Sequence, residues 1–281
     1  MRTRRPLAAL LSLFALTAAA VPAAPVRAAD ALPPGEAAAP ARLEKSPRHG
    51  EYVDVKVPNG KPLKAYVVYP ERKDKAPVVI VIHEIFGLSP WIKSVADQLA
   101  ADGFIAIAPD LLTGMAPEGK GTEGFAKRDD VVQAVRGLKP DQVVAGLNAV
   151  RDYGKGLPSS SGKSATVGFC WGGGQSFSYA LAQPELSAAV VYYGTNPGAE
   201  AVANLKVPVA GFYGGNDNRV NSTIPPAQEA AKKAGKTYEP TIYEGAGHGF
   251  LRQQDGQNGA NQKATEQAWP ATLKFLREHT K

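Results

Sequence analysis

The fold is decided by one stretch of the chain, ATVGFCWGGG at residues 165–174. It begins with apolar residues typical of a buried strand and continues with small residues suited to a helix that packs closely on a sheet. Gly168 and Gly172 flank Cys170 at a spacing that a sharp turn requires, because a Cβ at either position would collide with neighbouring backbone. The stretch therefore predicts a strand, a tight turn and a helix.

Strand-like and helix-like runs alternate on both sides of this stretch. Residues 77–82 (PVVIVI) form the continuous β-branched run expected of a strand buried on both faces, and Asn59-Gly60 favours a hairpin turn. Strands are expected near 53–57, 63–69, 77–82, 104–108, 165–169, 188–192, 207–213 and 238–243, and helices near 89–101, 124–136, 140–153, 172–183, 224–235 and 264–278. One hairpin followed by repeated β-α units predicts an α/β fold, with a mostly parallel eight-stranded sheet and helices on both faces.

The N-terminus has the layout of a secretory signal peptide. Residues 1–29 contain three arginines among the first five positions, an apolar run at 7–20 and a candidate cleavage site at Ala28-Ala29. The alternative is an uncleaved membrane anchor, but the apolar run is short for a span. We expect a periplasmic or secreted protein, exported by the Sec or twin-arginine route, with no membrane span in its mature form.

The composition changes again after the predicted signal peptide. Residues 30–50 are rich in alanine and proline and show no helical or strand period, which predicts a flexible leader before a single domain over 51–281. Residues 1–29 hold four arginines and no acid, so removing them from the net charge of +6 leaves +2. No basic block stands out in the remainder, so no nucleic-acid partner is expected. We expect a monomer.

Cys170 is the one cysteine of the chain. It stands in a G-x-nucleophile-x-G pattern, with cysteine where serine is usual. In this arrangement the following helix directs its free amides toward the sulfur, and the amide of Trp171 is placed to donate to an oxyanion. The alternative is a buried structural cysteine in a glycine-rich turn.

Two further residues supply a base and an acid. Asp217 follows the expected strand at 207–213, and His248 follows the one at 238–243. The chain order nucleophile, acid, histidine is that of α/β-hydrolases, and the carboxyl ends of parallel strands meet at one edge of the sheet. We therefore expect both side chains near Cys170. The alternatives are that Asp217 caps a turn and that His248 is an ordinary loop histidine.

A second loop, HEIFG at 83–87, also follows a strand. In this fold such a loop supplies the second oxyanion donor, for which the amide of Ile85 is our candidate. Glu84 places a carboxylate beside the site. The functional hypothesis is that it contacts the thiol or the histidine and tunes their protonation, and the alternative is a surface acid in a turn.

With these residues assembled, the chain resembles the dienelactone hydrolase family over residues 50–280. The stretches that carry the resemblance are HEIFG at 83–87, APDL at 108–111, GFCWGGG at 168–174, YGGND at 213–217 and GHGFLR at 247–252. The resemblance implies an α/β-hydrolase fold and a catalytic triad of Cys170, Asp217 and His248. It also implies that Glu84 pairs with the cysteine in the resting enzyme.

The resemblance further implies two arginines that bind a substrate carboxylate. Arg252 matches one of them and Arg128 is the expected counterpart of the other, the alternative being two solvated surface arginines. The implied activity is carboxymethylenebutenolidase-like hydrolysis of a small-molecule ester or lactone through a thioester, with no cofactor and no metal. The competing hypothesis is a non-catalytic small-molecule-binding or thiol-sensing protein that keeps the fold. Redox cycling is disfavoured because the chain has no second cysteine to resolve a disulfide.

Overall fold

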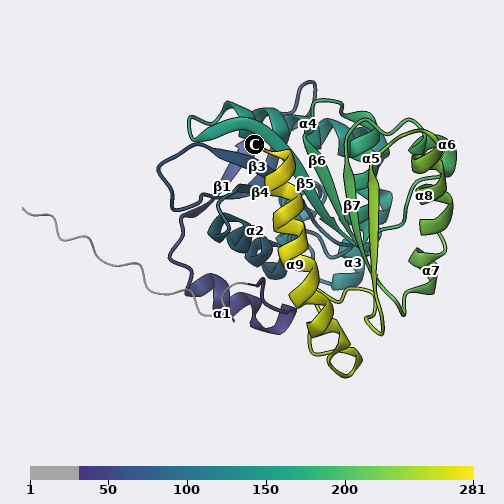
Figure 1. Ribbon diagram of the computed structural model, residues 1–281. Coiled ribbons are helices and arrows are strands. Elements are labelled where there is room, and N and C mark those ends of the chain that lie inside the picture. The colour runs from purple at the N-terminus through teal and green to yellow at the C-terminus, as the bar shows by residue number, and fades with distance from the viewer. Residues whose placement is uncertain (1–31) are drawn as a thin grey trace, which may run out of the picture. The chain divides into compact units, whose positions relative to one another are not determined.

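The strands form one eight-stranded sheet in the computed structural model, which describes residues 32–281 (Figure 1). The strand order is β1-β2-β4-β3-β5-β6-β7-β8. The strands are β1 (Gly50–Val55), β2 (Leu63–Val68), β3 (Ala76–Ile82), β4 (Ile105–Pro109), β5 (Ser160–Phe169), β6 (Ala188–Tyr192), β7 (Val209–Gly214) and β8 (Tyr238–Tyr243). The β1–β2 and β2–β4 pairs are antiparallel and the other neighbours are parallel, which confirms the predicted sheet.

Helices cover both faces of the sheet, as predicted. They are α1 (Ala39–Glu44), α2 (Pro90–Ala101), α3 (Arg128–Gly137), α4 (Pro140–Gly156), α5 (Trp171–Ala182), α6 (Ala199–Val202), α7 (Asn218–Asn221), α8 (Ile224–Lys233) and α9 (Ala260–His279). Short 3-10 turns are η2 (Glu36–Ala38), η3 (Pro117–Gly119), η4 (Thr122–Gly124) and η5 (Gln257–Gly259). One hydrophobic core joins α1, α2 and α9 to one face of the sheet, and a second joins α4, α5 and α8 to the other.

The strands differ in burial according to their place in the sheet. Residues 78–82 of β3 are fully buried, because a central parallel strand has helices on both sides. In β1, at the edge, exposed and partly buried residues alternate, since only one face packs on the protein. The next helix, α2, begins after Ser89, whose hydroxyl accepts a hydrogen bond from the amide of Ile92 at 3.4 Å.

The segment before β1 departs from the sequence prediction. Residues 30–50 were expected to form a flexible leader, yet η2 and α1 lie within them. The compact unit begins at Leu32, so the expected start of the domain at residue 51 is wrong.

Long-range contacts account for this departure. Ala39 is fully buried in the core that also contains α2, and the indole of Trp91 donates to the carbonyl of Pro34 at 3.0 Å. Arg48, which is partly buried, forms an ion pair at 2.6 Å with the buried Asp97 of α2. Contacts of this kind order a segment whose own sequence has no period, which is why composition alone predicted disorder.

Residues 1–29, predicted to be a signal peptide, lie outside the described part of the chain. Over residues 32–281, no helix combines the length and the apolar character needed to cross a membrane. Export therefore remains a prediction from the sequence.

Candidate active site

Cys170 stands at the turn between β5 and α5. Its backbone has φ 54° and ψ −115°, a strained combination for a residue other than glycine. A Cβ on Gly168 would lie 2.0 Å from the carbonyl oxygen of Gly172, and a Cβ on Gly172 would lie 2.3 Å from that of His83. The two glycines are therefore required by close backbone packing, and the sharp turn expected from the sequence is present.

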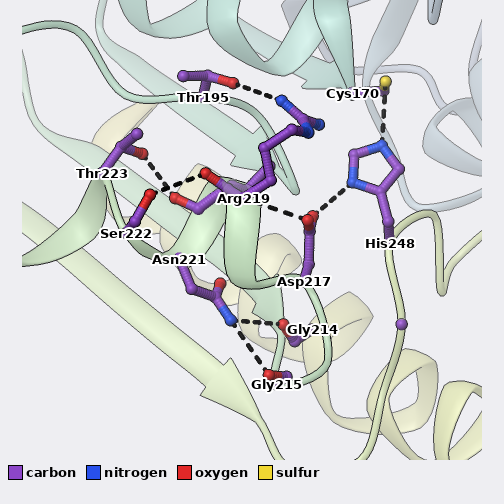
Figure 2. A network of polar contacts seen from close by, with 12 residues as sticks. Cys170, Thr195, Gly214, Gly215, Asp217, Arg219, Asn221, Ser222, Thr223 and His248 are labelled. Carbon is purple, nitrogen blue, oxygen red and sulfur yellow. Dashed lines mark hydrogen bonds and ion pairs between the residues drawn. The ribbon is translucent and has the colours of Figure 1, made fainter.

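Three side chains from three different strand ends form a hydrogen-bonded row (Figure 2). His248 Nε2 lies 3.1 Å from the Sγ of Cys170, and His248 Nδ1 lies 2.5 Å from Oδ2 of Asp217. Cys170 follows β5, Asp217 follows β7 and His248 follows β8. The structure thus brings together the three residues that were expected to be close, because each follows a parallel strand and their order along the chain is nucleophile, acid, histidine.

Asp217 holds two partners at once. While Oδ2 faces His248, Oδ1 caps α7 by accepting from the amide of Val220 at 3.4 Å. Asn221 fixes the same loop by donating to the carbonyl of Gly214 at 2.8 Å (Figure 2). Burial raises the pKa of Asp217, but the hydrogen bond and charge of His248, with smaller effects of Val220 and Arg219, together outweigh burial and hold that pKa below its usual value. The capping alternative and the pairing with histidine therefore both hold for this carboxylate.

The imidazole of His248 favours its charged form. Burial lowers its pKa, but the hydrogen bonds with Asp217 and Cys170 and the charges of these two groups together outweigh burial and raise the pKa of His248 to about 9. The side chain is 34% exposed, so it also faces solvent. The row can therefore keep a proton on nitrogen beside the sulfur and still receive a ligand from outside.

The row opens on a cavity of about 700 Å³. Its lining includes Cys170, His248, Ile85 and Trp171. The amides of Ile85 and Trp171 donate to no acceptor within the described residues. Both amides are therefore free to bind an oxygen that develops negative charge near the sulfur.

Two arginines line the same cavity. Arg136 comes from α3, and Arg219 of α7 donates to the hydroxyl of Thr195 at 3.3 Å (Figure 2). No carboxylate lines the cavity in the part of the chain that the structure describes. Across residues 32–281 no group of three or more His, Cys, Asp or Glu is arranged to hold a metal ion.

Tyr193 is a site residue that the sequence analysis missed. It follows β6 directly, has φ 39° and is fully buried. Its ring meets the imidazole of His248 edge-on, with 5.2 Å between centroids, and its hydroxyl has no hydrogen-bond partner among the described residues. Its position at the end of the VVYYG run at 190–194, directly after an expected strand, is the sequence signal that could have predicted it.

Glu84 is almost fully buried, at 2% exposure, and its partner is Arg252. Oε2 of Glu84 lies 2.7 Å from Nε of Arg252, while Oε1 has no hydrogen-bond partner in residues 32–281. Burial raises the pKa of Glu84, and the charges of Arg252 and His248 oppose this in part. From the sequence, this carboxylate was expected to contact the thiol or the histidine. The carboxylate pairs with Arg252 instead and acts on His248 through space.

Arg252 and Arg128, expected to bind a substrate carboxylate, both pair with Glu36. Nη1 of Arg252 donates to Oε2 of Glu36, and Nη2 of Arg128 lies 3.3 Å from Oε1. Neither arginine lines the 700 Å³ cavity. The two guanidinium groups are thus together, but on a carboxylate of the chain itself. Glu36 comes from the segment expected to be a flexible leader, so the sequence analysis missed it.

Known proteins are similar to this chain in sequence and in fold. The model of the dienelactone hydrolase family matches residues 63–280. A "Putative carboxymethylenebutenolidase" of Saccharolobus solfataricus is 31% identical over 257 residues, covering 79% of this chain and 96% of its own. The one of Escherichia coli K12 is 30% identical over 233 residues, covering 78% and 84%.

Solved structures of dienelactone hydrolases are similar to this chain in fold. The crystal structure of a "Putative Dienelactone Hydrolase" from Klebsiella pneumoniae has a TM-score of 0.72 at 26% identity, covering 82% of this chain and 98% of that one. A dienelactone hydrolase from Anabaena variabilis shares the fold at 19% identity, with a TM-score of 0.62, and the match covers 83% of this chain and 99% of that one. The family match supports a hydrolase that acts on an ester or a lactone. The chain has the α/β-hydrolase fold and belongs to the dienelactone hydrolase family.

Proposed function

We propose that this protein is a carboxymethylenebutenolidase-like carboxylic ester hydrolase that cleaves its substrate through a thioester on Cys170. One observation supports the proposal above all: His248 links the sulfur to Asp217 at the mouth of a cavity. A nucleophile, a base and an orienting acid within hydrogen-bond reach of one another are the geometry that nucleophilic acyl transfer requires.

In the first half-reaction, the sulfur of Cys170 attacks the carbonyl carbon of the ester or lactone. His248 holds the thiol proton and transfers it to the leaving oxygen as the C–O bond breaks. The amides of Ile85 and Trp171 donate to the oxyanion of the tetrahedral intermediate. Losing one such donor typically costs about 3 kcal/mol of transition-state stabilisation.

In the second half-reaction, water attacks the thioester. His248 removes a proton from the water, and the C–S bond then breaks, so that the thiolate leaves beside the protonated imidazole and the starting state is restored. Asp217 holds the imidazole in the orientation that both steps need and stabilises its positive charge. The carboxylic acid leaves as the second product.

The direct test is Cys170→Ala with 4-nitrophenyl acetate as substrate. We expect turnover to fall by roughly 10⁴-fold or more, with unchanged thermal unfolding showing that the variant folds. Mass spectrometry of the wild type during turnover should find an acetyl group on the peptide that contains Cys170. Undiminished turnover of the variant would refute the mechanism. A wild type without turnover or adduct would favour the competing small-molecule-binding protein.

We also propose that the protein is exported to the periplasm or beyond and acts as a monomer. The support for export is the basic and apolar layout of residues 1–29. Cell fractionation of chains with and without these residues tests export, and sedimentation of the mature chain tests the oligomeric state. Retention of the full chain in the cytoplasm, or a dimer at micromolar concentration, would refute the respective proposal.

A further inference from the structure

Arg252 and Arg128 create a positively charged site beside the catalytic row. Arg252 lies four residues after His248 and pairs with Glu84, in the loop that also carries a proposed oxyanion donor. The two guanidinium carbons lie 5.1 Å and 3.6 Å from the ring centroid of Phe86. Two guanidinium groups gathered over one ring make a site with the geometry and charge to bind a carboxylate.

This arginine site is occupied by Glu36. Its two carboxylate oxygens are divided between the guanidinium groups, Oε2 on Arg252 and Oε1 on Arg128. The side chain of Glu36 is 42% exposed and that of Arg128 is 55% exposed. The site therefore borders solvent, and an anion that replaced Glu36 would reach the arginines without opening the core.

The segment that carries Glu36 is held by contacts other than its carboxylate. The amide of Glu36 donates to the carbonyl of Arg252 at 2.9 Å, and the side chain of Gln254 donates to the carbonyl of Pro33 at 2.8 Å. Ala39, three residues further on, is fully buried. Removing the carboxylate alone should therefore empty the arginine site and leave the segment in place.

We propose that Glu36 is a specificity-determining residue. Its carboxylate occupies the arginine site and thereby directs the enzyme to esters or lactones that carry no carboxylate at the end facing Arg252 and Arg128. This inference rests on the proposed function. A carboxylate attached to the chain competes with free anions at a high effective concentration, so an anionic substrate must first displace it. A neutral substrate meets no such competition.

The alternative is that the ion pairs merely fasten the segment to the domain. A fastening role predicts that loss of Glu36 lowers stability and reduces activity on every substrate alike. A specificity role predicts a change in the ratio between an anionic and a neutral substrate. The two roles therefore differ in a measurable quantity.

The experiment compares Glu36→Ala with Glu44→Ala. Glu44 belongs to the same segment, is exposed and makes no hydrogen bond or ion pair with the described residues, so it is a matched control. The substrates are mono-4-nitrophenyl succinate and its methyl ester, which differ in one negative charge. We expect the ratio of kcat/KM, anionic over neutral, to rise about tenfold or more in Glu36→Ala, the usual gain from a new charge-assisted pair. The ratio should not change in Glu44→Ala.

Calorimetric titration with succinate provides a readout that does not depend on hydrolysis. Glu36→Ala should bind succinate more tightly than the wild type and Glu44→Ala do. Equal succinate binding in all three proteins, or an unchanged substrate ratio, would overturn the inference. If the wild type fails to hydrolyse the methyl ester, the proposed function falls, while the titration still decides whether Glu36 blocks an anion site.

Discussion

Replacing Arg252 by methionine should destabilise the fold strongly, because it strands a buried carboxylate. Glu84 is 2% exposed, and Arg252 is the partner of its Oε2, while its Oε1 has none within the described residues. Removing one member of a buried ion pair typically costs about 3–5 kcal/mol. Glu36, the other carboxylate on Arg252, is partly exposed and can regain water, so it adds little.

The stability of Arg252→Met should also depend on pH, because Glu84 can take up a proton. Burial already raises the pKa of Glu84 above its ordinary value of 4.5, and loss of Arg252 raises it further. The folded state then binds the proton more tightly than the unfolded chain does. Stability from this group is therefore fully present below pH 4.5 and is lost as the pH rises through the raised pKa. The destabilisation should be larger at about pH 8 than at about pH 5.

Urea unfolding, followed by tryptophan fluorescence at the two pH values, measures these effects. Arg128→Met is the matched control. Its side chain is 55% exposed, so its ion pair with Glu36 should contribute about 0–1 kcal/mol. Adding Glu84→Met to Arg252→Met should restore the free energy of unfolding to within about 1 kcal/mol of the wild type, because the stranded charge is gone. Equal losses for the two arginine variants, or no recovery in the double variant, would refute this account.

Three further changes test the site. Asp217→Asn should lower the pKa of His248 from about 9, which moves the alkaline limb of the kcat/KM profile to lower pH, and should reduce kcat by up to about 10⁴-fold. If the pKa of His248, measured by NMR titration of the imidazole, does not shift, the pairing with Asp217 is contradicted. Gly172→Ala should lower the free energy of unfolding by about 2 kcal/mol or more and remove most of the activity, because its Cβ would lie 2.3 Å from a main-chain oxygen. In the control Gly174→Ala the nearest atom to the Cβ is 3.3 Å away, so the loss in the same unfolding assay should be less than about 1 kcal/mol. Tyr193→Phe should raise the free energy of unfolding by about 1 kcal/mol, because it removes a buried hydroxyl that has no hydrogen-bond partner among the described residues. A lower melting temperature for this variant would show that the hydroxyl does have a partner.

The hydrogen-bonded row was predictable because its signals are local. Each of the three residues follows a strand that the sequence marks by a β-branched or aromatic run, and parallel strands bring their carboxyl ends to one edge. Gly168 and Gly172 add a steric requirement that can be inferred from their spacing around Cys170. The positions of Cys170, Asp217 and His248 after their strands, with the geometry of parallel sheets, were therefore enough to predict that the three side chains lie together.

The surroundings of the row were not predictable in the same way. The contact between Glu36 and Arg252 joins residues 216 positions apart, and nothing near Glu36 has a helical or strand period. The partner of Glu84 could not be inferred either, because Arg252 and the thiol are both close to its loop and only packing decides between them. Such choices depend on long-range contacts, whose energies do not appear in local composition.

The proposed chemistry and the proposed substrate choice rest on different parts of this chain. The family match begins at residue 63, so it covers the sheet strands and loops that carry Cys170, Asp217 and His248, but it does not include Glu36. Membership of the family therefore supports the reaction and is silent on the carboxylate that fills the arginine site. Since Glu36 reaches that site from a segment outside the matched region, the specificity that we propose for it can change with this segment while Cys170, Asp217 and His248 stay the same. The arginines alone would indicate an anionic substrate, and the occupant of their site reverses that inference.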